Sequence, residues 1–431
     1  MKLFPFAHAT HPSWRMAVEL VLAQLFAQKE KPAYAQNPSL GILYITDHYS
    51  DFAEHIVESL RQALPFVSDW VGTVGVGISS NNVEYFDEPA LSIMLCDIDP
   101  IHFRVFNGIS PLSAALKGDF KANLALIHAD GQTPDLGELI KEMAQKTEKN
   151  YLFGGLSSSR SKVMQFSVSP TTPLVSGNTE QMGDSQKNTS GIFTGGMSGV
   201  AFDESVKIIT RVTQGCYPVS KPRQITSCEG HIILTLDGKP ALDVLLEDLK
   251  ASLKEPRDGL IKKVKATLVA LTDPSLVITK KTGGLQDHAL VRHIIGLDTQ
   301  RRGVAVAETV STGMQLTFVE RNSITARADL VRIATEIREA LEPAEMTETE
   351  ARELNSSALE NAPDASRKIA GAIYISCAGR GGPHFGSHSA ELQLLNRALG
   401  DIPLIGFFAG GEIAQQNLYG YTGVLSIFVM N

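Results

Sequence analysis

The sequence predicts an α/β fold made of two pseudo-repeated halves, with mixed β-sheets covered by helices. Apolar runs that end in glycine turns alternate with stretches of helical period. In addition, the order of elements at 124–202 is repeated at 371–428: an apolar run, a helical stretch, a glycine-containing apolar run and a last strand. We expect a pseudo-two-fold relation that brings the glycine turns together. The alternative is two ordinary αβ units whose turns each need glycine.

The first half alternates between the two periodicities. Apolar residues at helical spacing predict helices at 13–29 and 51–64, and a short helix is expected at 110–118. The polar stretch at 170–190 cannot bury an apolar face and is interpreted as a long loop. Apolar runs predict strands at 39–46, 71–77, 90–97, 102–106, 124–131, 151–157 and 193–202, with a helix at 135–146.

The second half contains one strong local signal, Asp237-Gly238 between apolar residues, which predicts a hairpin within 229–240. Helices are expected at 242–253 and 326–341, mixed strands at 288–320, and strands at 371–376 and 403–408. Residues 342–368 are rich in Glu, Ala and Ser and predict an exposed acidic connector. We place the border between the halves at 215/216, which gives domains at 1–215 and 216–431.

Composition excludes several classes of protein. The net charge is −8 and no basic block is present, so we expect neither nucleic-acid binding nor attachment to an anionic membrane. We expect no secretory signal, because the N-terminal residues lack an apolar core run and a small-residue cleavage site. Every apolar window is shorter than the roughly 18 residues that span a bilayer. The four cysteines form no CxxC pair. We therefore expect a cytoplasmic protein with free thiols.

Two glycine turns at strand ends carry chemically useful side chains. Arg380 lies between glycines, where we expect its guanidinium to be uncrowded and able to clamp a carboxylate. Glu412 could receive an α-amino group, so the pair predicts an amino acid or a similar small polar metabolite as ligand. The alternatives are an arginine that ties two loops together, or a structural Arg380–Glu412 salt bridge. The predicted ligand-binding residues are Gly154, Gly155, Ser157, Cys377, Gly379, Arg380, Gly381, Gly411 and Glu412.

Cys377 allows a second hypothesis, an enzyme with a cysteine nucleophile. The neighbouring arginine and a following helix start both favour the thiolate, and His384 or His388 could act as base. His384, His388 and Glu391 also have a spacing that suits metal ligands, but Pro383 and Gly386 interrupt that helix. Neither a P-loop nor a dinucleotide fingerprint is present. We expect no metal and no cofactor.

These motifs carry a family resemblance. The segments CAGRG and PLIGFFAGGEI resemble the C-terminal half of the FIST domain family, and LFGGLSSSR and GGMSGVAF resemble its N-terminal half. The resemblance extends over nearly the whole chain. It implies a small-molecule sensor in signal transduction, with amino acids suggested as ligands and a partner protein that receives the signal. A third hypothesis is a scaffolding module whose glycine turns serve only close packing.

Overall fold

The computed structural model describes residues 2–112, 120–170, 191–252, 254–273, 289–341 and 369–430. The chain forms two compact units. Unit 1 comprises Met1–Thr213, Leu330–Leu418 and Thr422–Asn431, and unit 2 comprises Gln214–Asp329 and Tyr419–Tyr421. Unit 2 is therefore an insertion in the sequence of unit 1. The predicted connector at 342–368 and most of the predicted loop at 170–190 and short helix at 110–118 lie outside the described residues.

Unit 1 consists of three copies of one arrangement. In each copy, two parallel strands flank a helix, and a later strand pairs antiparallel with the first of them. The first copy contains β1 (Phe6–Thr10), α1 (Trp14–Lys29), β2 (Leu40–Thr46), α2 (Ala53–Ala63), β3 (Asp69–Gly75), β4 (Gly77–Ser80), β5 (Val83–Phe86) and β6 (Ala90–Cys96). The second contains β7 (Phe103–Phe106), β8 (Leu124–Asp130), α4 (Leu136–Gln145), β9 (Leu152–Ser157), β10 (Gln165–Val168), β11 (Ile192–Phe193) and β12 (Met197–Phe202). The third contains β13 (Ile208–Gln214), α7 (Ser323–Leu341), β22 (Ile369–Cys377), α9 (Ala390–Leu399), β23 (Leu404–Ala409), β24 (Glu412–Gln415), β25 (Asn417–Tyr419) and β26 (Thr422–Val429).

The copies exchange hairpins in a cycle. The first sheet has the order β1-β6-β2-β3-β10-β11, the second β25-β24-β9-β8-β12-β7, and the third β13-β26-β22-β23-β4-β5. The β4–β5 hairpin of the first copy thus completes the third sheet, β10–β11 of the second completes the first, and β24–β25 of the third completes the second. The repeat predicted at 124–202 and 371–428 corresponds to the second and third copies. The expected pseudo-two-fold relation is wrong, because a third copy at 6–96 closes a cycle of three.

Each copy has a glycine at an equivalent position of its second parallel strand. Gly72, Gly154 and Gly406 lie in the second parallel strand, and a Cβ added to any of them would stand 1.7–1.9 Å from a carbonyl oxygen of the neighbouring strand. Since that oxygen belongs to the backbone, it cannot move away without breaking the strand pairing. Glycine at these positions therefore allows the two parallel strands of each copy to approach.

Replacing Gly406 by alanine is expected to lower the free energy of unfolding by about 3 kcal/mol, because the new methyl group would overlap Tyr374 O. Gly137 in α4 is a matched control, with nothing within 4 Å of an added Cβ, so Gly137→Ala should stabilise by about 0.5–1 kcal/mol. Urea denaturation of both variants measures the difference. Equal stability of the two variants would contradict this account of the glycine.

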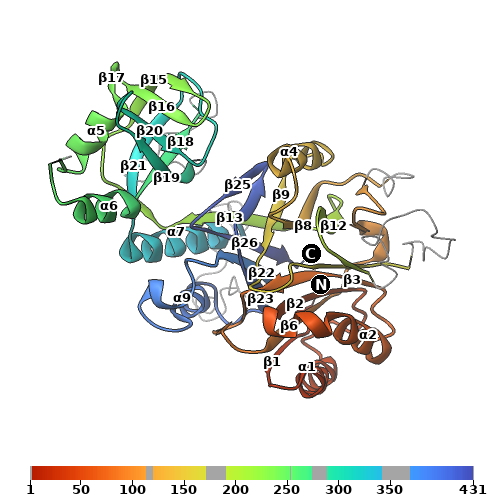
Figure 1. The fold of residues 1–431 in the computed structure, drawn as a ribbon. Helices are drawn as coiled ribbons and strands as arrows, with labels where there is room; N and C mark the ends of the chain where they lie inside the picture. Colours follow the sequence, from red (N-terminus) through yellow and green to blue (C-terminus); the bar gives the residue numbers. More distant parts are fainter. Residues whose placement is uncertain are drawn as a thin grey trace, which may run out of the picture. The chain divides into compact units, whose positions relative to one another are not determined.

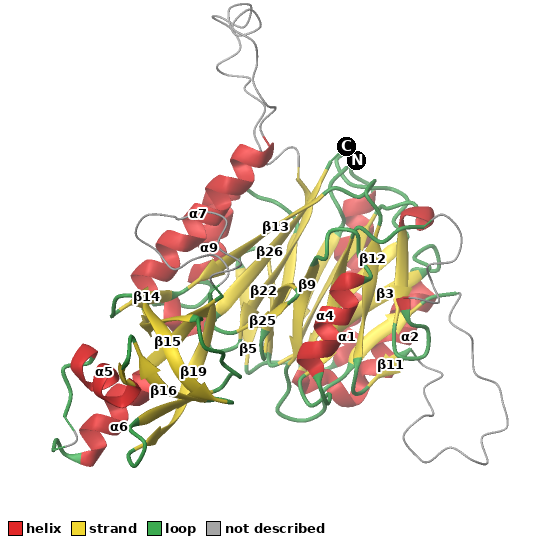
Figure 2. Cartoon of the chain, turned by 90° about the horizontal axis from the view of Figure 1, so that it is seen from above, coloured by secondary structure: helices red, strands yellow, loops and turns green. Residues whose placement is uncertain are grey.

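Helices cover the outer faces of the three sheets, while the inner faces meet in the core of unit 1 (Figures 1 and 2). In the first sheet, Leu43 and Ile45 pack in one apolar cluster with α1 and α2. The alternate residue Tyr44 points to the inner side, where its ring meets His128 of the second sheet and Phe407 of the third. The three ring centroids are 5.0–5.8 Å apart. Each sheet thus contributes one ring to the centre.

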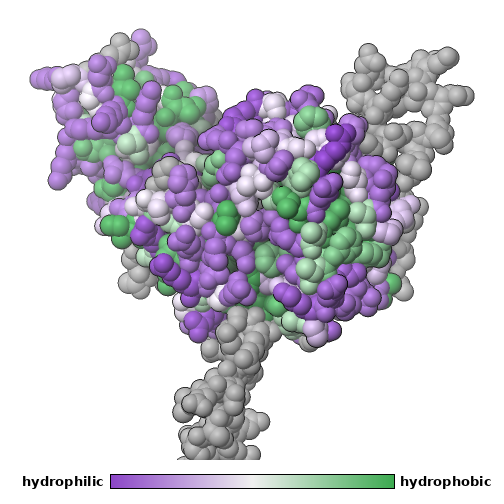
Figure 3. All heavy atoms as spheres, turned by 90° about the horizontal axis from the view of Figure 1, so that it is seen from below, coloured by the Kyte–Doolittle hydropathy of each residue, from purple (hydrophilic) through white to green (hydrophobic). Residues whose placement is uncertain are grey.

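The outward face of α1 is unusually apolar. Met16, Leu20 and Phe26 are each nearly half exposed, and Figure 3 shows apolar side chains gathered on the face of the molecule seen from below. No helix among the described residues is long and apolar enough to cross a membrane.

In its described residues, unit 2 is a ring of antiparallel strands that also contains helices α5 (Ala241–Asp248) and α6 (Arg257–Ala266). The order β21-β15-β16-β20-β19-β18 closes because β18 also pairs with β21. Asp237 and Gly238 both have positive φ, 49° and 77°, which confirms the predicted hairpin between β16 and β17. The described elements of unit 2 are β14 (Cys216–Pro218), β15 (Arg223–Glu229), β16 (Ile232–Leu236), β17 (Lys239–Pro240), α5 (Ala241–Asp248), α6 (Arg257–Ala266), β18 (Thr267–Thr272), β19 (Leu290–Asp298), β20 (Gly303–Val306) and β21 (Gln315–Arg321).

Candidate functional site

The predicted site residues all lie in unit 1, around the carboxyl ends of β9, β22 and β23. Gly155 in β9 is directly opposite Glu412 in β24, and Leu156 N donates to Gly411 O at 2.8 Å. Cys377, at the end of β22, is in register with Ala409 at the end of β23. The carboxyl ends of parallel strands are the usual place for ligands in α/β sheets. The exchanged hairpin β24–β25 is what brings the glycine turns of the two predicted halves together.

Arg380 is buried, with 1% of its surface exposed, so the expectation of an uncrowded guanidinium is wrong. Its Nε donates to Glu391 Oε1 at 2.7 Å, and its Nη1 and Nη2 donate to Thr213 O and Oγ1 at 3.3 and 3.1 Å. Phe385 lies against the guanidinium at 5.2 Å. The turn therefore directs Arg380 inward, where α9 supplies a carboxylate. Of the structural alternatives, a buried salt bridge is present, but its partner is Glu391 and not Glu412.

Glu391 is the centre of this buried network. Its Oε1 also accepts a hydrogen bond from Tyr374 Oη at 2.6 Å, and its Oε2 accepts one from Ser376 Oγ at 3.0 Å. Burial and the nearby Glu391 carboxylate raise the pKa of Tyr374 well above its usual value, so the phenol remains a donor. Sequence reasoning treated Glu391 only as a metal ligand. Its spacing of four and eight residues from the buried Leu395 and Leu399 was the signal that it faces the core.

Glu412 is fully buried and only partly hydrogen-bonded. Its Oε2 accepts from Thr422 N at 3.1 Å and from Thr422 Oγ1 at 2.7 Å. Its Oε1 accepts no hydrogen bond from a nitrogen or oxygen donor in the part of the chain that the structure describes, and the weak donor beside the carboxyl is the Cys377 thiol. Burial raises the pKa of Glu412 to about 8, although Thr422, Arg380 and the Cys377 thiol each favour the charged form. At neutral pH this carboxyl therefore carries its proton.

Glycine turns flank Cys377 and Glu412 in the chain. Gly379 and Gly410 are exposed and Cys377 is half-buried. A Cβ added at Gly410 would meet nothing closer than 3.8 Å, so the turn is open there. The acid–base group that the structure places next to the Cys377 thiol is the Glu412 carboxyl, whereas His388, one of the two predicted bases, is exposed.

The serines of the predicted site are engaged within the protein. Ser157 Oγ and Thr73 Oγ1 are hydrogen-bonded at 2.5 Å. The next residue, Ser158, accepts from Val76 N at 3.0 Å and donates to Phe408 O. Since Val76, Ser158 and Phe408 belong to the first, second and third copies, this hydroxyl holds the three copies together. The hydroxyls of Ser157 and Ser158 thus bond groups in the neighbouring copies.

The equivalent strand ends in the other two copies are filled by the chain itself. Asp47, which follows β2, accepts from Arg160 N, Nε and Nη2 at 2.8–2.9 Å. Burial opposes ionisation there, but the hydrogen bonds and charge of Arg160 outweigh it, so the pKa of Asp47 is lowered. Asp130, at the end of β8, accepts from Gln132 N and Gly195 N. The first copy thus shows a buried carboxylate at a strand end that receives a guanidinium.

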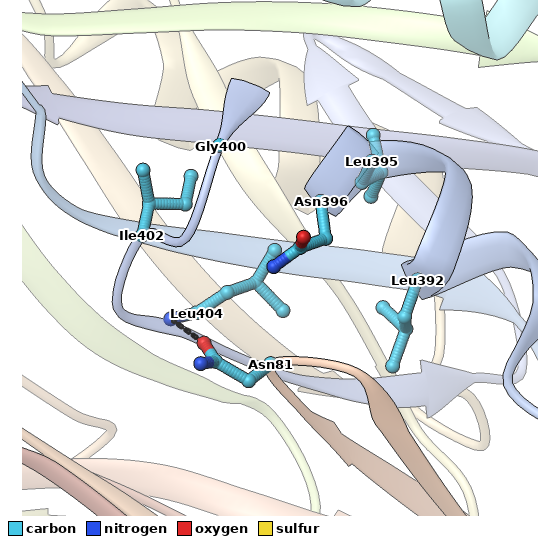
Figure 4. A pocket seen from close by; sticks show the side chains of 7 residues that line it. All are labelled: Asn81, Leu392, Leu395, Asn396, Gly400, Ile402 and Leu404. Carbon is cyan, nitrogen blue, oxygen red and sulfur yellow. Dashed lines mark hydrogen bonds between the residues drawn. The ribbon is translucent and has the colours of Figure 1, made fainter. Parts of the chain in front are cut away.

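A shallow surface pocket lies away from these residues (Figure 4). Much of the space in it is open to solvent, so it encloses little volume of its own. The side chain of Asn81 is already engaged, because its Oδ1 accepts from Leu404 N and its Nδ2 donates to Asp401. None of the predicted site residues contributes to this pocket, which is lined by Asn81, Leu392, Leu395, Asn396, Gly400, Ile402 and Leu404.

Comparison with known proteins places the chain in a family. The FIST N domain matches residues 39–239 and the FIST C domain matches residues 241–415. An uncharacterised protein of Mycobacterium tuberculosis is 25% identical over 430 residues, which are 98% of each chain. An uncharacterised protein of Mycobacterium bovis is 25% identical over 406 residues, or 91% of each chain. FIST domains are linked in general to signal transduction and to the sensing of small ligands. This chain belongs to the FIST family and contains both its N and C domains.

Proposed function

We propose that this protein is a sensor that binds a small metabolite with an amino group, such as an amino acid, beside Glu412 and transmits its occupancy to a partner protein. The observation that carries the proposal is the buried Glu412 carboxyl with one oxygen that accepts no hydrogen bond from a nitrogen or oxygen donor among the described residues. Leaving such an atom unsatisfied costs about 1–3 kcal/mol. A ligand that donates to Oε1 would recover this free energy.

The charge state of Glu412 favours a cationic donor. A positive charge within about 4–6 Å of a carboxyl favours the ionised form. Because burial holds the pKa of Glu412 at about 8, an ammonium group that binds near neutral pH would displace the carboxyl proton.

The other predicted residues have supporting roles in this proposal. Cys377, Gly379, Gly381 and Gly411 form the turns beside the carboxyl, and Gly154 and Gly155 permit close packing of β9 below it. Arg380 lies near enough to Glu412 to favour its charged form. Although Arg380 is bound to Glu391, its positive charge would also favour the carboxylate of an amino acid at the same turn.

A thermal-shift screen against amino acids and small amines tests this site. We expect at least one amine-bearing compound to raise the melting temperature, since a ligand at about 100 times its dissociation constant adds about 2.7 kcal/mol. The shift should disappear in Glu412→Gln and persist in Glu142→Gln, which makes the same chemical change at an exposed position of α4. Calorimetry in buffers of different ionisation enthalpy should show proton release on binding.

Two results would contradict the proposal. One is a hit whose shift survives in a folded Glu412→Gln protein, which would place the ligand elsewhere. The other is a screen in which no amine-bearing compound changes the melting temperature. Binding without proton release would retain the site but reject the ammonium as the group that meets Glu412.

A further inference from the structure

Two rows of polar side chains face each other inside unit 1. In the first sheet, Tyr44 is in register with Ser92 on one side and with Thr73 on the other, and Thr73 is in register with Gln165. Directly paired residues on neighbouring strands point to the same face of a sheet. This face is the inner one, because Tyr44 Oη lies 3.2 Å from Nε2 of His128 in the second sheet.

The second sheet carries the equivalent row. His128 is in register with Ser198 on one side and with Gly155 on the other, and Gly155 is in register with Glu412. The row at the same level of the third sheet is entirely apolar: Val424, Ile375, Phe407 and Ile78. The polar groups therefore gather where the first and second sheets meet, and the third sheet closes them off with hydrocarbon.

Among the described residues, most buried side-chain polar atoms without a hydrogen bond belong to these two rows. Nine buried side-chain atoms among the described residues have no hydrogen-bond partner, and five of them belong to the two rows. Buried polar atoms are normally satisfied, and each one left alone lowers stability. The five atoms are Ser92 Oγ, Gln165 Oε1, His128 Nδ1, Ser198 Oγ and Glu412 Oε1.

Moving protons between these groups cannot give every one of the atoms a hydrogen-bond partner, and His128 shows why. Burial lowers the pKa of His128 to about 3, so the ring is neutral and has one donor and one acceptor. Tyr44 Oη occupies the Nε2 side in either tautomer. The Nδ1 side therefore always needs a further partner, and the residue paired with His128 there is Ser198, whose hydroxyl is also unsatisfied.

We propose that ordered water molecules lie in this seam between the first and second sheets and hydrogen-bond Ser92 Oγ, Gln165 Oε1, His128 Nδ1 and Ser198 Oγ, whereas the Glu412 carboxyl lies beside the Cys377 thiol. Water is the ligand that suits them, because it both donates and accepts and one molecule typically makes two to four hydrogen bonds. Ser92, His128 and Ser198 are 0% exposed, so the site excludes larger solutes. The small serine side chains flank the Tyr44–His128 pair on both sides. The inference does not depend on the proposed sensor function.

Serine-to-alanine variants should shift the melting temperature in opposite directions, depending on whether water is hydrogen-bonded to the serine hydroxyls. If water satisfies the hydroxyls, Ser92→Ala and Ser198→Ala should each lower the melting temperature. Ser426→Ala is the matched control, because Ser426 is also fully buried and its hydroxyl is hydrogen-bonded to Thr210 Oγ1 at 3.0 Å. If the hydroxyls have no partner, their removal should raise the melting temperature while Ser426→Ala still lowers it.

A high-resolution crystal structure of the unaltered protein provides a second readout that does not depend on variants. The expected result is water density within hydrogen-bonding distance of His128 Nδ1 and Ser198 Oγ. The proposal is overturned if that density is absent and Ser198→Ala raises the melting temperature. It is also overturned if His128 and Ser198 are found to bond each other directly.

Discussion

Replacing Arg380 by alanine is expected to lower the free energy of unfolding by about 3–5 kcal/mol. The change leaves the Glu391 carboxylate buried with only the neutral donors Tyr374 and Ser376, and it leaves Thr213 O and Oγ1 without their donors. Removal of one member of a buried ion pair costs more than the pair contributes, because the remaining charge stays away from water. Urea denaturation monitored by circular dichroism measures the loss.

Lys162→Ala is the control for Arg380→Ala. Lys162 Nζ pairs with Asp51 at 2.7 Å, but the two side chains are 65% and 72% exposed, so the loss should stay below about 1 kcal/mol. A similarly small loss for Arg380→Ala would mean that its guanidinium is hydrated, as the sequence alone suggests. If the large loss is found, Arg380→Ala cannot serve as a test of ligand binding, because its effect on folding would dominate.

Glu412→Gln is expected to change how stability depends on pH. The pKa of Glu412 is about 8 in the folded protein against 4.5 as its ordinary value, so between these values the folded state holds a proton that the unfolded state has lost. Unfolding then becomes easier as pH rises. Each pH unit inside this window is worth about 1.4 kcal/mol. Glutamine does not titrate, so the variant should gain about 2–3 kcal/mol relative to the unaltered protein between pH 6 and pH 8.5.

Denaturation curves at several pH values measure this gain. Glu142→Gln is at an exposed position of α4, and its free energy of unfolding should change with pH in the same way as that of the unaltered protein. If the free energy of unfolding of Glu412→Gln also changes in this way, Glu412 is ionised throughout, and the proton release expected on ligand binding would be excluded.

The elements with local signals were predicted closely. The helix expected at 13–29 is Trp14–Lys29, the one expected at 326–341 lies within Ser323–Leu341, and Asp237-Gly238 forms the predicted turn. Periodicity and turn chemistry depend on neighbouring residues, so they are visible in the sequence. FIST membership was also predicted, because the order of the glycine turns is a property of the sequence itself.

The features that sequence reasoning missed depend on partners far away in the chain. β4 pairs with β23, whose residues lie more than 300 positions later, and a strand pattern does not identify its partner. The first copy was overlooked because Thr46 and Asp47 stand where the third copy has a glycine turn. The guanidinium of Arg380 was expected to be uncrowded because Thr213 is 167 positions away and Glu391 was considered only as a metal ligand. Long-range pairing decides both the cycle of hairpins and the burial of this charge.

The cyclic exchange of hairpins has the form of a closed trimer. Three separate and identical chains, each giving a hairpin to the next, would complete every sheet with the same number of strands. In this protein the segments 97–102 and 203–207 join the copies in one chain. The end of the third copy contacts the start of the first, where the ring centroids of Phe428 and Phe4 are 5.5 Å apart. Fusion of three genes would make such an assembly independent of protein concentration. It would also free each copy to diverge, so that the end of β2 in the first copy could be sealed by Arg160 of the second copy without the same change elsewhere.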